Sequence, residues 1–252
     1  MPPITLHMVL ARQIAADLAE EPLSGQTGAY LLGATTPDIR VITRQDRFST
    51  HFFDLDDHRR QDSVLNFFAQ HSHLADAGAL NDETRAFVAG YVSHLILDEQ
   101  YITGVYRPFF AAHEQLGGKV RANVMDRLLQ FDLERRQCGD PELKQHMCDA
   151  LSCSVENIQS GFVEPETLER WRLVSVDVAG RNMDWDRMRG MMTNHLKVSG
   201  IAEGEQLGAF LDSLPDLLDA TMAHVTDAEV QAFLDRSTAA ARTAVARYLA
   251  CE

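Results

Sequence analysis

The stretch Ala86-Phe-Val-Ala-Gly-Tyr-Val-Ser-His-Leu-Ile-Leu-Asp-Glu99 is the most informative part of this chain. It is apolar nearly all round and long enough to form a buried helix. Its polar members His94 and Asp98 are four residues apart, so on a helix their side chains lie on one face. Burying an imidazole and a carboxylate together costs free energy unless something pairs with them. The pair therefore predicts either a divalent cation at this face or a direct hydrogen bond between the two side chains.

Three further side chains that could bind a metal lie upstream: His7, Asp38 and His51. They stand in apolar or turn-like segments that do not need a histidine or an aspartate at these positions. His7 falls on the apolar stripe of a helix expected over residues 4–20, and Asp38 is expected on irregular chain just after Pro37. Each alone has an ordinary alternative, such as a core histidine bonded to a carbonyl or an aspartate in a turn. Imidazole nitrogens with carboxylate oxygens suit zinc, iron or manganese. Five donors are enough for one closed site, or for two ions that share a bridging carboxylate.

Apolar residues recur at helical spacing along almost the whole chain. No stretch alternates apolar and polar residues for long enough to form a sheet, so the expected fold is all-α, a multihelical bundle. We expect a single helical domain over residues 1–252, in which residues 1–118 carry the candidate metal site and residues 119–252 are plain helices. A domain boundary near residues 155–165 is the alternative.

Capping signals predict where two of the helices begin and end. Asn81 and Asp82 are expected to cap the central helix, which runs to about Tyr101 or Thr103 and breaks at Gly104. Thr226-Asp-Ala-Glu229 is a capping box that opens a final helix to about Leu249. Residues 40–50 are expected to form a polar loop.

The composition excludes some classes of function. The 252 residues are 45% hydrophobic and 24% charged, which is ordinary for a soluble protein, and their formal net charge is −14. That charge repels polyanions and argues against a general nucleic-acid binder, but it allows a small phosphate ester at a metal. The four cysteines form no CxxC pair and are expected to be reduced thiols. No signal peptide and no apolar run of about 20 residues is present, so we expect a cytoplasmic protein without a transmembrane segment.

Four short pieces occur between about residues 5 and 115: Thr5-Leu6-His7, Leu32-Gly-Ala-Thr-Thr-Pro-Asp38, Thr50-His51-Phe52 and Gly90-Tyr-Val-Ser-His94-Leu-Ile-Leu-Asp98. Their order and spacing resemble those of the zinc-dependent phospholipase C family, whose fold is shared with the P1/S1 nucleases. The resemblance implies a multihelical fold of the phospholipase C/P1 nuclease type, with a metal cluster at the core of the bundle.

The resemblance also implies an assignment of metal ligands. Asp38, His51, His94 and Asp98 match the ligands of one metal. Asp98 also matches a carboxylate that bridges to a second metal, to which His7 corresponds.

The sequence departs from the family's pattern at two places. In secreted members the second metal also binds an N-terminal tryptophan, whereas this sequence begins Met1-Pro2-Pro3. The third metal site has no clear match, because Gly104 stands near an expected histidine and His113 is followed four residues later by Gly117 instead of a glutamate. We therefore expect one or two divalent ions, zinc before iron or manganese.

These observations predict a metal-dependent hydrolase of a phosphoester, phospholipase C-like or phosphodiesterase-like, that acts on a small phosphoester or a lipid headgroup. Asp38, or a free acid such as Asp54, is the candidate for orienting the nucleophilic water. Candidates for a phosphate clamp are Arg44, Arg47 and Arg107. Candidates for additional metal or substrate contacts are His113, Asp54 and Arg107.

Two other functions use histidine and aspartate on helices. A metal phosphohydrolase of the HD type requires an adjacent His-Asp dipeptide, and none occurs in this sequence. The alternative is a non-catalytic helical binding or regulatory protein with a structural metal, because a closed four-ligand site holds helices together without an open position. The sequence leaves the oligomeric state open.

Overall fold

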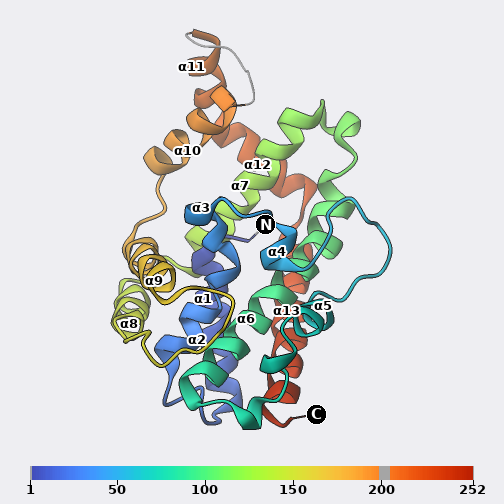
Figure 1. Cartoon of the computed structure of the whole chain (residues 1–252). Coiled ribbons are helices and arrows are strands. Elements are labelled where there is room, and N and C mark those ends of the chain that lie inside the picture. Colours follow the sequence, from blue (N-terminus) through green and yellow to red (C-terminus); the bar gives the residue numbers. More distant parts are fainter. Residues whose placement is uncertain (1, 199–204, 252) are drawn as a thin grey trace.

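The fold is arranged around helix α6 (Asp82–Tyr101), which is buried along most of its length. A computed structural model describes residues 2–198 and 205–251 of the chain. Helix α6 packs against several helices that surround it in Figure 1, among them α1 (Ile4–Leu18), α2 (Thr27–Gly33), α5 (Ser63–Gln70) and α13 (Asp227–Leu249). At its start the Asn81 side chain accepts a hydrogen bond from the backbone N–H of Thr84 at 2.8 Å. The predicted central helix and its cap are confirmed.

Helices α2 and α6 cross at close range because each has a glycine at the contact. A Cβ atom on Gly33 would lie 1.9 Å from the carbonyl oxygen of Phe87, and one on Gly90 would lie 2.0 Å from the carbonyl oxygen of Tyr30. Neither place has room for a side chain, so the two backbones are in direct contact. This contact sets where the chain that follows α2 lies relative to α6.

The central helix does not break at Gly104, so that prediction is wrong. It continues directly into the π-helix η4 (Ile102–Phe110), at the end of which the Ala111 N–H bonds to the carbonyl of Tyr106, five residues earlier. A glycine inside a helix costs only about 1 kcal/mol relative to alanine. The buried side chains of η4 offset this cost, and they are Ile102, Val105 and Phe110.

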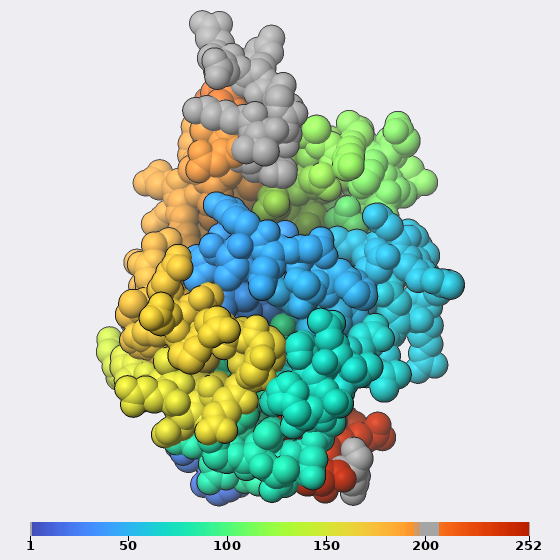
Figure 2. Space-filling view, in the orientation of Figure 1, coloured from blue at the N-terminus to red at the C-terminus, as the bar shows by residue number. Residues whose placement is uncertain are grey.

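The segment between α2 and α5 is more helical than predicted. Asp38 lies in a 3₁₀ helix, η1 (Thr36–Ile39), where irregular chain was expected. The expected polar loop over residues 40–50 contains α3 (Arg40–Thr43) and the first three residues of α4 (Phe48–His51). Helices of a single turn are too short for a periodic apolar pattern, so the sequence gives no sign of them. Figure 2 shows this blue segment at the surface, between the yellow and cyan parts of the chain.

The remaining elements are also helical. The capping box at α13 is confirmed: the Glu229 N–H lies 3.3 Å from Thr226 Oγ1, and the Glu229 carboxylate accepts the Thr226 N–H at 2.8 Å. Residues 2–198 and 205–251 contain no strand, which confirms the all-α fold. The helices not yet given are η2 (Ser72–Leu74), η3 (Ala77–Ala79), η5 (His113–Leu116), α7 (Lys119–Gln137), α8 (Pro141–Leu151), α9 (Pro165–Gly180), α10 (Trp185–Val198), α11 (Glu205–Asp212) and α12 (Leu214–His224).

Buried apolar side chains form two clusters. The larger one draws mainly on α1, α2, α6, α8, α9 and α13, and the other mainly on η4, α7, α10, α12 and α13. Helices α1, α6 and α13 contribute to both clusters, so the two regions share their central elements. None of the described helices combines the length and the apolar character needed to cross a membrane.

Candidate metal centre

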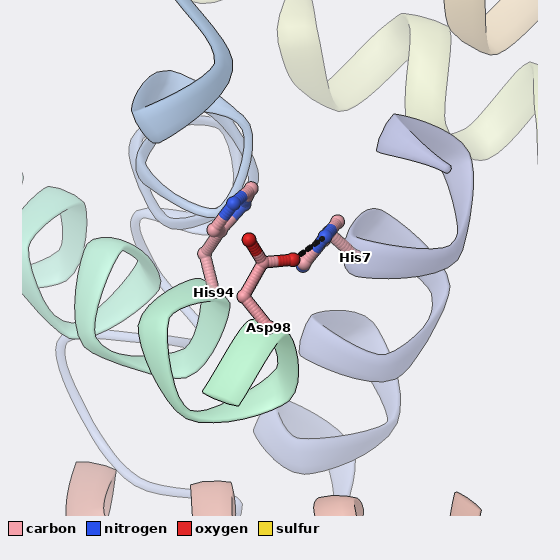
Figure 3. A group of neighbouring side chains, drawn as sticks. All are labelled: His7, His94 and Asp98. Carbon is pink, nitrogen blue, oxygen red and sulfur yellow. Dashed lines mark ion pairs between the residues drawn. The ribbon is translucent and has the colours of Figure 1, made fainter. Parts of the chain in front are cut away.

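Five donor side chains from four elements meet beside the C-terminal half of α6. His7 comes from α1, Asp38 from η1 and His51 from the last position of α4, while His94 and Asp98 project from successive turns of α6. Figure 3 shows the Asp98 carboxylate between His94 and His7, where α1 faces α6. All are at most 2% exposed except Asp38, whose side chain is 14% exposed. The structure thus brings together all five residues that the sequence nominated as metal ligands.

Several atoms of the donor side chains lack hydrogen-bond partners. They are His7 Nδ1 and Nε2, His51 Nε2, His94 Nε2 and Asp98 Oδ1, and all of them are buried. A buried polar atom without a partner costs about 1–3 kcal/mol. Since one of the two His7 nitrogens carries a proton in the neutral ring, four of these atoms offer a lone pair, and together they indicate that the centre binds a group that accepts lone pairs.

The separations between these atoms fit a metal ion better than hydrogen bonds. His51 Nε2 lies 3.5 Å from Asp38 Oδ1 and 3.4 Å from Asp98 Oδ2, and His7 Nε2 lies 3.5 Å from Asp98 Oδ1. Such distances exceed those of good hydrogen bonds. A tetrahedral ion with bonds of about 2.0–2.2 Å holds neighbouring ligand atoms about 3.3–3.6 Å apart. These three pairs of donor atoms therefore already stand at the spacing of neighbouring ligands in a zinc site.

Two overlapping groups of three donors bring their ligand atoms close together. His7, His94 and Asp98 offer atoms that all lie within 4.8 Å of one another, and so do Asp38, His51 and His94. His94 belongs to both groups. Nitrogen and carboxylate oxygen are the donors that zinc takes in proteins, so the residues present fit a divalent metal.

A backbone carbonyl and a hydroxyl group contact the Nδ1 atoms of His94 and His51 and set the orientation of these two rings. His94 Nδ1 lies 2.8 Å from the carbonyl oxygen of Ala34, so Nδ1 carries the proton and Nε2 keeps its lone pair toward the centre. His51 Nδ1 lies 2.8 Å from the hydroxyl of Thr50, whose carbonyl accepts the Tyr91 hydroxyl at 2.5 Å. Because His94 Nε2 has no hydrogen-bond partner, the alternative of a direct hydrogen bond between His94 and Asp98 is not observed.

Burial and neighbouring charges favour the protonation states that bind a cation. Burial, with His7 stacked 3.6 Å from its ring, lowers the pKa of His94 to about 3, so this imidazole stays neutral. Burial alone would raise the pKa of Asp98, but His7, His94 and His51 outweigh it and hold that pKa well below its usual range. The same balance, with His51 and His94 as neighbours, lowers the pKa of Asp38. Near neutral pH the centre therefore presents two carboxylates and a neutral imidazole.

Helix α13 closes the centre on the His7 side. A small cavity of about 10 Å³ next to His7 is lined by Ser93 of α6 and by Ser237 and Ala241 of α13. A cavity of this volume is barely large enough for one water molecule. The more open side lies toward Asp38 and Arg47, whose side chains are 14% and 12% exposed.

Arg47 reaches the centre in a way that the sequence analysis missed. Its Nη2 lies 2.8 Å from Asp98 Oδ2, and its Nη1 donates to the carbonyl of Phe53 at 3.1 Å. From the sequence Arg47 is a candidate for a phosphate clamp, whereas the structure pairs it with a proposed metal ligand. Arg47 precedes His51 by four residues, the spacing that puts two side chains on one side of a helix, so its place near His51 could have been expected, whereas its pairing with Asp98 could not.

The other nominated residues lie apart from the donor groups. Asp54 is exposed and bonds within its own loop, and Arg107 donates to carbonyl groups of that loop with its guanidinium 5.4 Å from the Phe53 ring centroid. Within the described chain, neither Asp54 nor His113 belongs to a close group of three metal donors. Arg44 is exposed at the end of α3.

Comparison with known proteins gives one match. No curated protein and no solved structure matches the chain. The sequence model of one family, described as zinc dependent phospholipase C, matches residues 6–99, and all five donor residues lie inside this segment. Over residues 6–99 the chain is therefore similar to the zinc-dependent phospholipase C family, which confirms the resemblance seen in the sequence.

Proposed function

We propose that this protein is a metal-dependent hydrolase of a phosphoester. The observation that carries the proposal is the set of buried His7, His51, His94 and Asp98 atoms without hydrogen-bond partners, gathered with Asp38 at separations that suit the ligands of a metal ion. The family match over residues 6–99 supports the same class of chemistry. Phosphoester is the substrate class that the family's description suggests, as a small diester or a lipid headgroup.

Asp38, His51, His94 and Asp98 would hold one divalent ion, zinc before iron or manganese, and His7 extends the donor set on the other side of Asp98. A bound ion of this kind lowers the pKa of water to near neutrality and neutralises charge on phosphoryl oxygens. The polypeptide supplies fixed donors, a site that excludes most water, and ring orientations set by Ala34 and Thr50.

Asp38 is our candidate for orienting the nucleophilic water. Of the five donors it has the most exposed side chain, and it lies on the more open side of the centre. The lowered pKa of its carboxyl group keeps it ionised near neutral pH, as an acceptor of a water proton must be. Asp54, the other acid considered, is bound within an exposed loop.

The burial of the donors also favours a second candidate function, a helical binding or regulatory protein with a structural metal. Four of the five donors are at most 2% exposed, and closed sites are typical of structural zinc. Both functions require a metal, and they differ in whether a position on the ion stays open to substrate.

Two measurements on the purified protein test the proposal. Elemental mass spectrometry should find stoichiometric metal in the wild type and in His146→Ala, an exposed-histidine control, and none in His94→Ala or Asp98→Asn. Metal-dependent hydrolysis of a chromogenic phosphodiester should follow the metal content. Bound metal without hydrolysis of any phosphoester would favour the structural role. A fully folded wild type that binds no added metal would refute both functions.

A further inference from the structure

The Arg47 guanidinium is held inside the donor cluster of the metal centre. Its Nη2 lies 2.8 Å from Asp98 Oδ2 and its Nη1 lies 3.1 Å from the Phe53 carbonyl, so two of its nitrogens are fixed at once. The side chain is only 12% exposed. A charge-assisted hydrogen bond of this length between partly buried groups is among the stronger polar contacts in proteins.

The charges at the centre disfavour the binding of more than one divalent cation. Asp38 and Asp98 carry two negative charges between them, and Arg47 supplies one positive charge at Asp98 Oδ2. One divalent ion added to these groups gives a net charge of about +1, and a second would raise it to about +3. Charges this close interact strongly because screening by water is reduced in a buried site.

The donors complete one site and leave two donor atoms for a second ion. His94 offers a single atom, Nε2, because its Nδ1 is bonded to Ala34, yet it belongs to both donor groups. An ion bound by Asp38, His51 and His94 leaves the other side of Asp98 with His7 Nε2 and Asp98 Oδ1. Zinc sites in proteins normally use three or four protein ligands, so a second ion held by two would be weakly bound and sensitive to a neighbouring positive charge.

We propose that the centre binds one divalent ion, at Asp38, His51, His94 and Asp98, and that the positive charge of Arg47 on Asp98 Oδ2 disfavours a second ion at Asp98 Oδ1, beside His7. This inference rests on the proposed metal-dependent function and specifies the composition of its site. Asp98 Oδ2 has more than one lone pair, so it can accept from Arg47 and still face the ion. Arg47 thereby orients a metal ligand and also keeps a further cation away from the position beside His7.

Removing the arginine charge should therefore open the second position. In Arg47→Gln the repulsion is lost, and we expect zinc to bind beside His7 at least about tenfold more tightly than in the wild type. Arg47→Lys keeps the charge and should bind one ion. Arg60→Gln removes an exposed arginine a short distance along the chain and is the matched control.

Isothermal titration of the metal-stripped proteins with zinc, checked by elemental analysis after dialysis, tests the proposal, and circular dichroism confirms that each variant is folded. One ion in the wild type, Arg47→Lys and Arg60→Gln, two in Arg47→Gln, and one again in Arg47→Gln/His7→Ala would support it. Two ions in the wild type, or one in Arg47→Gln with unchanged affinity, would overturn it and leave the proposed function intact. A wild type that binds no zinc would instead refute the proposed function itself.

Discussion

The Nδ1 atom of His94 lies 2.8 Å from the carbonyl oxygen of Ala34, the residue that follows α2. This distance depends on how closely α2 and α6 approach, and the approach depends on Gly33 and Gly90. The orientation of a proposed metal ligand is therefore set by a contact between two backbones four residues away from it.

Gly90→Ala tests this dependence. The new methyl group would lie 2.0 Å from the Tyr30 carbonyl oxygen and 2.7 Å from the Ala34 nitrogen, so α2 must move away. We expect unfolding in denaturant to show a loss of stability of about 1–3 kcal/mol or more, and zinc affinity to fall as His94 loses its carbonyl partner. Gly190→Ala is the control, because a Cβ there meets nothing within 4 Å and should leave stability unchanged or raise it. Equal changes of stability and zinc affinity in the two variants would contradict the dependence of the His94 orientation on Gly90.

Trp171→Phe tests how α9 supports the turn that carries Asp38. The buried indole Nε1 donates to Thr35 Oγ1 at 3.0 Å, one residue before η1. Loss of this hydrogen bond and of core volume should cost about 1–3 kcal/mol in denaturant unfolding and should weaken zinc binding. Trp185→Phe changes the only other tryptophan, which is 37% exposed, and should cost less than 1 kcal/mol. Unaltered zinc affinity in Trp171→Phe would show that η1 is held without the indole.

Zinc should stabilise the folded protein through the centre. A ligand that binds only the folded state adds about 2.7 kcal/mol to the free energy of unfolding at a concentration of 100 Kd. Denaturant unfolding of the metal-stripped protein with and without zinc measures this gain. Asp98→Asn should show none of it, whereas the exposed-residue variant His146→Ala should show all of it. A gain that persists in Asp98→Asn would place the zinc elsewhere.

The four free cysteines should differ sharply in reactivity. Burial raises the pKa of the Cys138 thiol to about 12, so at pH 8 almost none of it is the reactive thiolate. Cys251 is exposed and should be the first labelled by a maleimide in the folded protein, as located by mass spectrometry of peptides. Cys138 should react only after unfolding. Rapid labelling of Cys138 in native Cys251→Ser protein would contradict the burial seen in the structure.

The sequence was informative where one pattern extends over many residues. Helix α6 follows from its long apolar run and Asn81 cap, α13 from its capping box, and the five donors stand out because polar groups interrupt apolar segments. Predictions were wrong or missing where the decisive contact is made by distant or very short segments. The helical turns around Asp38 lack a periodic pattern, and Gly104 lies in a helix because its neighbours are buried. The Arg47–Asp98 pair joins residues 51 positions apart, which spacing along one helix does not reveal.

The position of α13 has a consequence for biosynthesis. The donor residues all lie in the first hundred positions, whereas Ser237 and Ala241, which close the His7 side, are translated much later. While the chain is still being made, the face of α6 that α13 covers is exposed to water, and metal ligands near it are hydrated and free to exchange ions. The centre therefore acquires its dry surroundings only when the last helix docks.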